Sequence, residues 1–489
     1  MAISRRNLLI ASGIGVAAVA TTATALTLEA ASVNENAPTL LEPPMLTSKA
    51  GLLELTLTAA YVDKTMNGKN VRMMSYNGTV PGPTIQVSPG DKLRIKFVNQ
   101  LGETTNLHTH GLHVSPEGNS DNPMVLIRDG ETFDYEYDIP ADHPTGTFWY
   151  HPHHHGTVAS QVYAGLYGAI IVTEQTESPS RVLVISDTSF ATDGSVAGAN
   201  LMSIMMGREG DFVMVNGVVQ PWAQMDRTSE RWRIVNACTS RNLNLSVVGG
   251  KSEILARDGH HVSTAEAGQP ATDMFLSPGN RVDVIVANTG KDVSLNYTTV
   301  VHPDSMGMGG MGYSTTEYKN YPLVTLKDSG KTVGDALLML GQPKPFADLR
   351  KLPPAGQREF VMNMPGMMGM MGMMGGGRSA LQGQFTINGK AFDPNRIDTA
   401  AKLNDVEEWT IHNQSTMAHP FHLHVWPMQL VSVNGTDVGP VRYQDVVNIP
   451  AKGYVTLRVH FANFAGTSVY HCHILDHEDL GMMALIQVS

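Results

Sequence analysis

A cysteine flanked by histidines lies almost at the C-terminus, in the stretch YHCHILDHEDLGMM at residues 470–483. If this stretch forms a β-strand, His471 and His473 share one face, because alternate side chains of a strand point to opposite sides. Cys472 then points to the other face. Imidazole binds copper, iron and zinc, whereas thiolate and thioether are soft ligands that favour copper. The spacing therefore predicts that one strand serves two metal sites.

Three further motifs concentrate histidines elsewhere in the chain: HTHG, WYHPHHHG and HPFHLH. A thiolate, two histidines and a weak axial methionine form the ligand set of a blue-copper electron-transfer site. Cys472, His419, His477 and Met482 match that set. The remaining candidates form four spaced pairs that suit three more metal ions: His108 and His110, His151 and His153, His422 and His424, and His471 and His473.

Each histidine cluster alone has simpler interpretations. A His-x-His pair on a strand is most often only part of a polar face, and zinc could explain any one cluster. The four clusters, together with a cysteine and a methionine at blue-copper spacing, favour copper. The other histidines, among them His113, His154, His155 and the 260–261 pair, are expected to lie on the surface or to support ligands through hydrogen bonds.

The combination of motifs resembles that of the three-domain bacterial multicopper oxidases, a family that contains laccases and exported cuprous oxidases. The resemblance extends from about residue 50 to the end of the chain. It implies an all-β fold of three cupredoxin-like Greek-key β-sandwich domains that hold four copper ions. The type 1 copper would be held by His419, Cys472, His477 and Met482, the type 2 copper by His108 and His422, and the type 3 pair by His110, His151, His153, His424, His471 and His473.

The same resemblance implies an oxidoreductase that takes single electrons from a small reductant and reduces O2 to two waters with four of them. Cys472 would take the electron on one face of its strand. The neighbouring histidines would deliver it to a trinuclear cluster between the first and third domains. At roughly 3.3 Å per residue plus ligand reach, the two centres would lie on the order of 10–15 Å apart.

Oxygen reduction also requires protons, which acidic side chains near the cluster can supply. Glu478 follows the ligand candidate His477 and matches the family's proton-donating acid. Glu117 or Asp121 could replace the acid that usually follows the first histidine motif, although the segment HVSPEGNSDNP does not align cleanly there. For Glu117 and Asp121 alike, a solvated carboxylate is the alternative interpretation.

A methionine-rich segment, MNMPGMMGMMGMMGGG at residues 362–377, bears on the identity of the reductant. Its methionines follow neither a helical nor a strand period, and interleaved glycines disfavour an ordered element. Thioethers bind Cu(I), and the segment resembles the methionine-rich loop of exported cuprous oxidases. An insert without a role is the alternative. The candidate ligands for substrate Cu(I) are Met364, Met367, Met368, Met370, Met371 and Met417.

One departure from the cuprous-oxidase pattern is Ser415, which occupies the position of an acid four residues before the type 1 histidine. A laccase-like oxidase of phenols or other reductants is therefore the alternative enzyme. A copper-free scaffold of the cell envelope and a Cu(I)-sequestering protein that consumes no oxygen are alternatives of other classes. The scaffold is disfavoured because all twelve ligand positions are occupied by suitable residues.

Short β-rich segments must position these motifs, as in TIQVSPGDKLRIKFVNQ and EEWTIHNQ. Their Val, Ile, Thr and aromatic residues between Gly, Pro and Asn turns predict sandwiches or barrels. A chain of 489 residues is also too long for one domain. We expect a first domain at 45–177, a middle domain at 178–345 that is a spacer without copper ligands, and a third domain at 346–489.

The net charge and the N-terminal sequence indicate which partners and which cellular location to expect. A formal charge of −11 without a basic cluster gives no footprint for nucleic acid. Residues 1–31 contain an arginine pair, a weak apolar run and the small-residue site at 23–25, which indicates a twin-arginine export signal. An uncleaved membrane anchor is the alternative. No later segment is long enough to span a membrane, so we expect the mature protein to be soluble. We also expect it to be exported and to be a monomer.

The chain contains two cysteines, Cys238 and Cys472. If Cys472 is a ligand, Cys238 has no partner for a disulfide bond. We therefore expect Cys238 to be a small buried residue rather than a reactive thiol.

Overall fold

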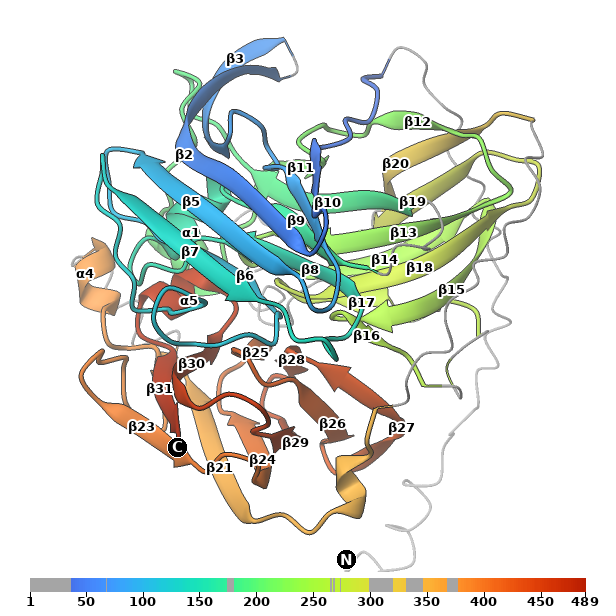
Figure 1. The fold of residues 1–489 in the computed structure, drawn as a ribbon. Coiled ribbons are helices and arrows are strands. Elements are labelled where there is room, and N and C mark those ends of the chain that lie inside the picture. The colour runs from blue at the N-terminus through green and yellow to red at the C-terminus, as the bar shows by residue number, and fades with distance from the viewer. Residues whose placement is uncertain are drawn as a thin grey trace, which may run out of the picture.

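β-Strands dominate the structure and form six sheets in the described part of the chain (Figure 1). The computed structural model describes residues 37–66, 68–173, 180–263, 266, 269–272, 274–298, 320–330, 346–366 and 377–489. The predicted export signal, the predicted boundary between 177 and 178, and residues 367–376 of the methionine-rich segment lie outside these ranges.

The N-terminal pair of sheets packs around a core that contains Phe97, Tyr135 and Ile170. One sheet has the order β3 (Lys69–Tyr76), β2 (Leu52–Met66), β5 (Lys92–Gln100) and β7 (Thr132–Asp138). The other has the order β1 (Met45–Thr47), β4 (Thr84–Val87), β9 (Gly168–Val172), β8 (Gly146–His151) and β6 (His108–His110). The short helix α1 (Val158–Tyr163) follows β8 in the chain.

The middle pair of sheets packs around a second core, in which Cys238 is buried as expected. One sheet has the order β11 (Phe212–Val215), β10 (Ser180–Thr188), β13 (Ser229–Asn236), β18 (Arg281–Asn288), β15 (Gly250–Arg257) and β16 (His260–His261). The other has the order β12 (Trp222–Met225), β20 (Asn320–Asp328), β19 (Val293–Thr298), β14 (Leu243–Val248) and β17 (Met274–Leu276). Helix α2 (Leu201–Met206) lies between β10 and β11 in the chain.

The C-terminal pair of sheets encloses a third core. One sheet has the order β22 (Thr386–Ile387), β21 (Gly356–Asn363), β24 (Val406–Asn413), β29 (Tyr454–His460), β26 (Met428–Val433) and β27 (Thr436–Gln444). The other has the order β23 (Ile397–Ala401), β31 (Met483–Val488), β30 (Gly466–Cys472), β25 (His419–Leu423) and β28 (Val446–Ile449). The helical segments are η2 (Leu349–Lys351), α4 (Gly377–Leu381) and α5 (Leu475–Asp479).

Alternating burial explains why these segments form sandwiches. In β5, Leu93, Ile95 and Phe97 are buried, while the side chains between them face outward or are half-buried. β24 shows the same period of two, with Trp409 and Ile411 in the core. Apolar burial on one face is the main stabilising contribution of such a sheet, and the period fixes which face it is.

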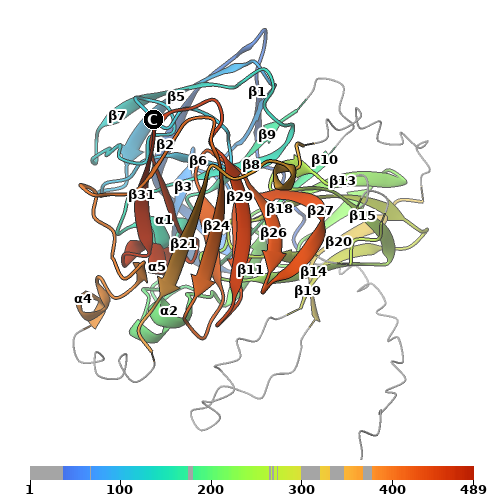
Figure 2. The same ribbon diagram turned by 90° about the horizontal axis from the view of Figure 1, so that it is seen from below.

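Helix α5 is the point at which all three pairs of sheets meet. It contacts α1 of the N-terminal pair and α2 of the middle pair. Figure 2 shows α2 and α5 together at one end of the C-terminal sheet that contains β21. Because α5 closely follows β30, which contains Cys472, the predicted metal-binding motif near the C-terminus lies at this junction.

No helix in the described ranges is both long and apolar enough to cross a membrane.

Candidate metal centres

Strand pairing brings the four histidine motifs together in two pairs. β6 is antiparallel to β8, with His108 opposite His151. β25 is antiparallel to β30, with His422 opposite His471 and Phe421 opposite Cys472. His108 and His110 lie within β6 and share one face, as the period of a strand requires. In the other three motifs the second histidine, His153, His424 or His473, follows the end of its strand.

Eight buried imidazoles from these strands and the segments that follow them form a single cluster: His108, His110, His151, His153, His422, His424, His471 and His473. Three of them converge most closely. His153 Nε2 lies 3.1 Å from His471 Nε2 and 3.2 Å from His424 Nε2, and the last two atoms are 3.1 Å apart. Three imidazole nitrogens that face one point are better arranged to bind one shared cation than to form hydrogen bonds with one another.

The second trio contains His110, His151 and His473. His110 Nδ1 lies 3.4 Å from His151 Nε2. The His473 ring lies 5.0 Å from the His110 ring and 5.7 Å from the His151 ring, centroid to centroid. The remaining two, His108 and His422, come from the first and third motifs, and their ring centroids are 5.8 Å apart.

Several of these nitrogens have no hydrogen-bond partner among the described residues: His108 Nε2, His422 Nε2, His424 Nδ1 and both ring nitrogens of His473. An unsatisfied buried polar group costs about 1–3 kcal/mol, so such an arrangement needs a ligand. Burial holds the pKa of each of the eight imidazoles below its usual range, which keeps them neutral and able to coordinate. The donor set fits copper, which accepts imidazole ligands.

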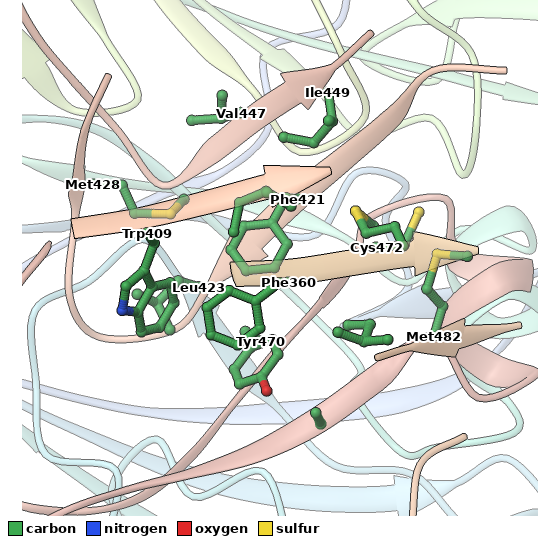
Figure 3. Close-up of a cluster of buried hydrophobic side chains, with 14 of the residues drawn as sticks. Phe360, Trp409, Phe421, Leu423, Met428, Val447, Ile449, Tyr470, Cys472 and Met482 are labelled. Atoms are coloured by element: carbon green, nitrogen blue, oxygen red, sulfur yellow. The ribbon is translucent and has the colours of Figure 1, made fainter. Parts of the chain in front are cut away.

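A smaller cluster on the other face of β30 combines sulfur and nitrogen. Cys472 Sγ lies 3.4 Å from His419 Nδ1 and 3.9 Å from His477 Nδ1. The two Nδ1 atoms are 3.4 Å apart. The Met482 side chain is buried in the same core cluster as Cys472 (Figure 3). The Met482 carbonyl accepts a hydrogen bond from the Cys472 amide. Burial raises the pKa of the Cys472 thiol, so a bound cation is needed to make it a thiolate at neutral pH.

Hydrogen bonds fix both histidines of this sulfur-containing cluster by their outer nitrogens. His419 Nε2 lies 2.7 Å from Ser415 Oγ. His477 Nε2 donates to the Met205 carbonyl oxygen of α2 at 3.2 Å. Both Nδ1 atoms consequently face Cys472, which is the tautomer that a metal on this side requires.

Glu478 is fully buried beside the histidine cluster. Its Oε2 lies 3.1 Å from His471 Nδ1, and its Oε1 lies 3.4 Å from His153 Nε2. Burial raises the pKa of Glu478 to about 7. A carboxyl group that titrates near neutral pH next to two cluster histidines has the properties of a proton carrier.

An acidic side chain also lies beside the first histidine motif, and this residue is Asp121. His108 Nδ1 donates to Asp121 Oδ2 at 2.9 Å, and the Thr109 amide donates to Asp121 Oδ1 at 2.8 Å. Burial raises the pKa of Asp121 to about 7. Glu117, the other sequence candidate, is exposed and lies against Gly466.

The methionine candidates fall into two groups. Met364 and Met417 are buried in the core cluster that contains Cys472 and Met482. Met205 of α2 belongs to the same cluster, and Met202 of α2 packs against it. The remaining candidates, Met367, Met368, Met370 and Met371, lie outside the described residues.

Sequence reasoning missed one acid at the histidine cluster. Asp445 Oδ1 accepts a hydrogen bond from His110 Nε2 at 3.0 Å, and the Asp445 carbonyl accepts one from His422 Nδ1 at 2.7 Å. The only signal in the sequence is a charged residue beside the apolar run VVNIP. Because charged residues are rarely buried unpaired, that position could have been examined for a partner.

Comparisons with known proteins identify the family of the chain. Two family models described as "Multicopper oxidase" match residues 58–177 and 362–489. The multicopper oxidase mco of Staphylococcus haemolyticus is 30% identical over 433 residues, covering 85% of this chain and 84% of that protein. The laccase of Bacillus subtilis is 24% identical over 526 residues, covering 92% and 97%. The cell division protein FtsP of Rahnella sp. is 28% identical over 484 residues, covering 94% and 93%.

Solved structures show the same likeness. A Campylobacter jejuni multicopper oxidase, described as a metallo-oxidase, superposes with a TM-score of 0.79 at 32% identity, covering 92% of this chain and 95% of that chain. A laccase-like multi-copper oxidase of Ochrobactrum sp. superposes with a TM-score of 0.77 at 27% identity, covering 92% and 100%.

The chain belongs to the multicopper oxidase family. The predictions of an all-β fold of three cupredoxin-like sandwich domains and of an oxidoreductase of the multicopper oxidase class are confirmed.

Proposed function

We propose that this oxidase oxidises Cu(I) to Cu(II) in copper tolerance and couples this to the reduction of O2. The balanced reaction is four Cu(I), one O2 and four protons giving four Cu(II) and two waters. The observation that carries the proposal is the closure of the sulfur-containing centre. Both of its histidines are fully buried, and Ser415 and the Met205 carbonyl occupy their outer nitrogens.

A closed centre disfavours a reductant that needs direct contact with a histidine edge. The Phe385 ring stacks on the His477 ring at 4.6 Å between centroids, which covers that imidazole further. Buried and half-buried methionines surround the same core. Thioether sulfur is a soft ligand for Cu(I), so a small metal ion can approach where a phenol ring is excluded. The description of the C. jejuni structure as a metallo-oxidase supports the same assignment.

Four copper ions would be held by the residues that the structure clusters. His419, Cys472, His477 and Met482 would hold the type 1 ion, which supplies one-electron transfer when bound. The type 2 ion would be held by His108 and His422. The type 3 pair would be held by the two trios, His110, His151 and His473, and His153, His424 and His471.

The protein's own groups orient ligands and carry protons. The Asp121 carboxylate, by accepting from His108 Nδ1, keeps Nε2 of that ring free to coordinate. The Cys472 carbonyl lies 3.0 Å from His471 Nδ1 and directs Nε2 of that ring into the cluster. Glu478, within reach of His153 and His471, would hold and deliver the protons that oxygen reduction consumes.

A laccase-like oxidation of phenols is the second candidate function. Ser415 favours it, because a serine lacks the negative charge with which the acid of cuprous oxidases would attract a metal cation. The two candidates share the copper ligands and differ only at the entry to the type 1 centre.

Oxygen uptake by the copper-loaded protein, measured side by side with Cu(I), Fe(II) and a bulky phenol, separates them. We expect the highest kcat/KM with Cu(I). A phenol kcat/KM that exceeds both metal ions would make the enzyme a laccase. Binding of Cu(I) without oxygen uptake would make it a sequestering protein.

We also propose that the protein is exported by the twin-arginine route to the periplasm or cell envelope and acts there as a monomer. The arginine pair at 5–6 and the small-residue site at 23–25 support the export route. Cell fractionation with and without a lysine pair at 5–6, together with light scattering of the purified protein, tests both statements.

A further inference from the structure

We propose that Arg281 of the middle domain is a positioning residue for the trinuclear cluster, which it reaches through Asp445 and the two candidate ligands that Asp445 contacts, His110 and His422. The proposal rests on the ligand assignment above. It gives the middle domain a part in the chemistry of a site whose ligands all come from the other two domains.

Arg281 is the first residue of β18 and contacts all three domains. It is 1% exposed. Its Nη1 donates to Asp445 Oδ1 at 2.6 Å and its Nη2 to Asp445 Oδ2 at 2.6 Å, so the pair is bidentate. Its Nε donates to the Thr147 carbonyl of β8 at 3.1 Å. A planar guanidinium fork fixes both the position and the plane of a carboxylate, which an ammonium group does not.

The residue that Arg281 holds, Asp445, is hydrogen-bonded to two candidate copper ligands from different domains, one through its carboxylate and one through its backbone carbonyl. Asp445 Oδ1 accepts from His110 Nε2, and the Asp445 carbonyl accepts from His422 Nδ1. The two imidazoles are stacked with centroids 3.9 Å apart and planes 8° apart. With the proton of His110 held on Nε2, its Nδ1 lone pair faces the His151 side of the cluster. Asp445 thus selects the tautomer of one ligand and the orientation of another.

The backbone beside His110 leaves room for this ion pair. Gly111 has φ +85°, and a Cβ added there would lie 2.4 Å from both Arg281 Nη2 and Asp445 Oδ2. Only glycine combines that backbone conformation with that space. The Arg281 and Asp445 side chains therefore meet directly beside the first histidine motif.

A second contact from the same middle-domain loop supports the assignment. A Cβ on Gly279, which has φ +88°, would lie 2.9 Å from His473 Nε2. Asn280 Nδ2 donates to the Val446 carbonyl, next to Asp445, at 2.9 Å. Three consecutive residues of the middle domain therefore pack on the cluster or on the residues that orient it.

Arg281→Lys is the decisive variant because it keeps the positive charge and removes the fork. We expect the type 1 blue absorption to be retained. The type 2 electron paramagnetic resonance signal should change, and reoxidation of the fully reduced enzyme by O2 should slow about 10–100-fold, the usual cost of losing a group that orients a metal ligand. KM for the reductant should not change, since the reductant is oxidised at the other centre.

Arg231→Lys is the matched control. Arg231 is an equally buried arginine of the middle domain and is paired with Asp283, a carboxylate whose partners include Thr147 and Arg233. The Arg231→Lys variant should lower the melting temperature of the copper-free protein without altering the type 2 signal. Equal loss of the type 2 signal in both variants, or a normal signal and reoxidation rate in Arg281→Lys, would overturn the proposal.

Asp445→Asn provides an independent test if Arg281→Lys does not fold. It keeps the shape of the side chain but removes the charge that Arg281 and His110 share, and we expect the same change in the type 2 signal with the blue absorption intact. An unchanged type 2 signal would count against the proposal. These readouts do not depend on which reductant the enzyme uses. Failure of the proposed function would instead appear as a preference of the wild-type enzyme for phenols, or as wild-type protein that binds fewer than four copper ions.

Discussion

Cys472 and His471 are adjacent in β30, yet their side chains belong to two different centres. Cys472 Sγ lies 3.4 Å from His419 Nδ1, whereas His471 Nε2 lies 3.1 Å from His153 Nε2. The side chains of neighbouring residues in a strand point to opposite faces, so a single peptide unit joins the two sites. The covalent path from the sulfur to the histidine cluster is consequently as short as a polypeptide allows.

Cys472→Ser tests this path. A serine hydroxyl is a poor substitute for thiolate, so the blue absorption and turnover should both disappear. Copper should remain at the other three positions, because none of their candidate ligands belongs to the cluster that contains Cys472. Elemental analysis and oxygen uptake measure the two effects. Retention of full oxidase activity would rule out the proposed electron path.

Glu478→Gln tests proton delivery. The amide keeps the size of the side chain but carries no transferable proton, so turnover should fall by about 10²–10⁴-fold, the usual contribution of a general acid. Copper content and blue absorption should not change. Glu407→Gln is the control, since Glu407 is also buried but pairs with Arg358, away from the histidines. Loss of copper in Glu478→Gln would indicate a structural role instead.

The clustering of the histidine motifs could be predicted from sequence because their geometry is local. His-x-His on a strand places two imidazoles on one face whatever surrounds them, and His471, Cys472 and His473 lie in or directly after β30 as expected. The Val, Ile, Thr and aromatic residues of the segments that form β5 and β24, set between turn residues, similarly predict sandwiches or barrels.

The orienting contacts could not be predicted because they depend on packing between distant segments. Arg281 and Asp445 are 164 residues apart and meet only when the middle and C-terminal domains dock. The choice between Glu117 and Asp121 was open for a related reason. A turn in which the Asp121 amide donates to the Ser115 carbonyl directs Asp121 back to His108, and the sequence does not specify that turn.

The Asp283→Asn variant tests how much the buried ion pairs of Asp283, at the contact between the middle and N-terminal domains, contribute to stability. Burial raises the pKa of Asp283, but Arg231 and Arg233 outweigh it and hold the pKa below its ordinary value of 3.8. Asp283 also accepts from Thr147 of the N-terminal domain at 2.6 Å. Removing one partner of a buried ion pair costs about 3–5 kcal/mol, so the melting temperature of the copper-free protein should fall clearly at neutral pH.

The pH dependence of that loss follows from the sign of the shift. A carboxyl group with a lowered pKa in the folded state stabilises the protein above its unfolded pKa and loses this effect as the pH falls through the folded value. The difference between wild type and Asp283→Asn should therefore shrink below pH 3.8. Asp138→Asn, which breaks an exposed pair with Arg94, should cost about 0–1 kcal/mol. A difference that grows on acidification would contradict the assignment.

Ser415→Asp tests the entry to the type 1 centre. A carboxylate in place of Ser415 Oγ, now 2.7 Å from His419 Nε2, adds negative charge that stabilises the oxidised site and attracts a cation. The type 1 reduction potential should fall, and KM for Cu(I) should fall several-fold while KM for a phenol does not. The Ser415→Asn variant is the control, because asparagine has the shape of aspartate without its negative charge. Equal effects of Asp and Asn would show that charge is not the cause.

Replacement of residues 367–376 by a Gly-Ser linker of equal length decides between the two enzymatic functions. Met364 and Met417 are buried in the core around Cys472 and are kept, so folding stability should change little. If the removed thioethers capture Cu(I), the Cu(I) rate should fall most at low substrate concentration, which appears as a higher KM. Phenols do not use thioethers, and their oxidation should hold steady or rise. Unchanged Cu(I) kinetics with slower phenol oxidation would assign the segment to an organic-substrate site and the enzyme to the laccases.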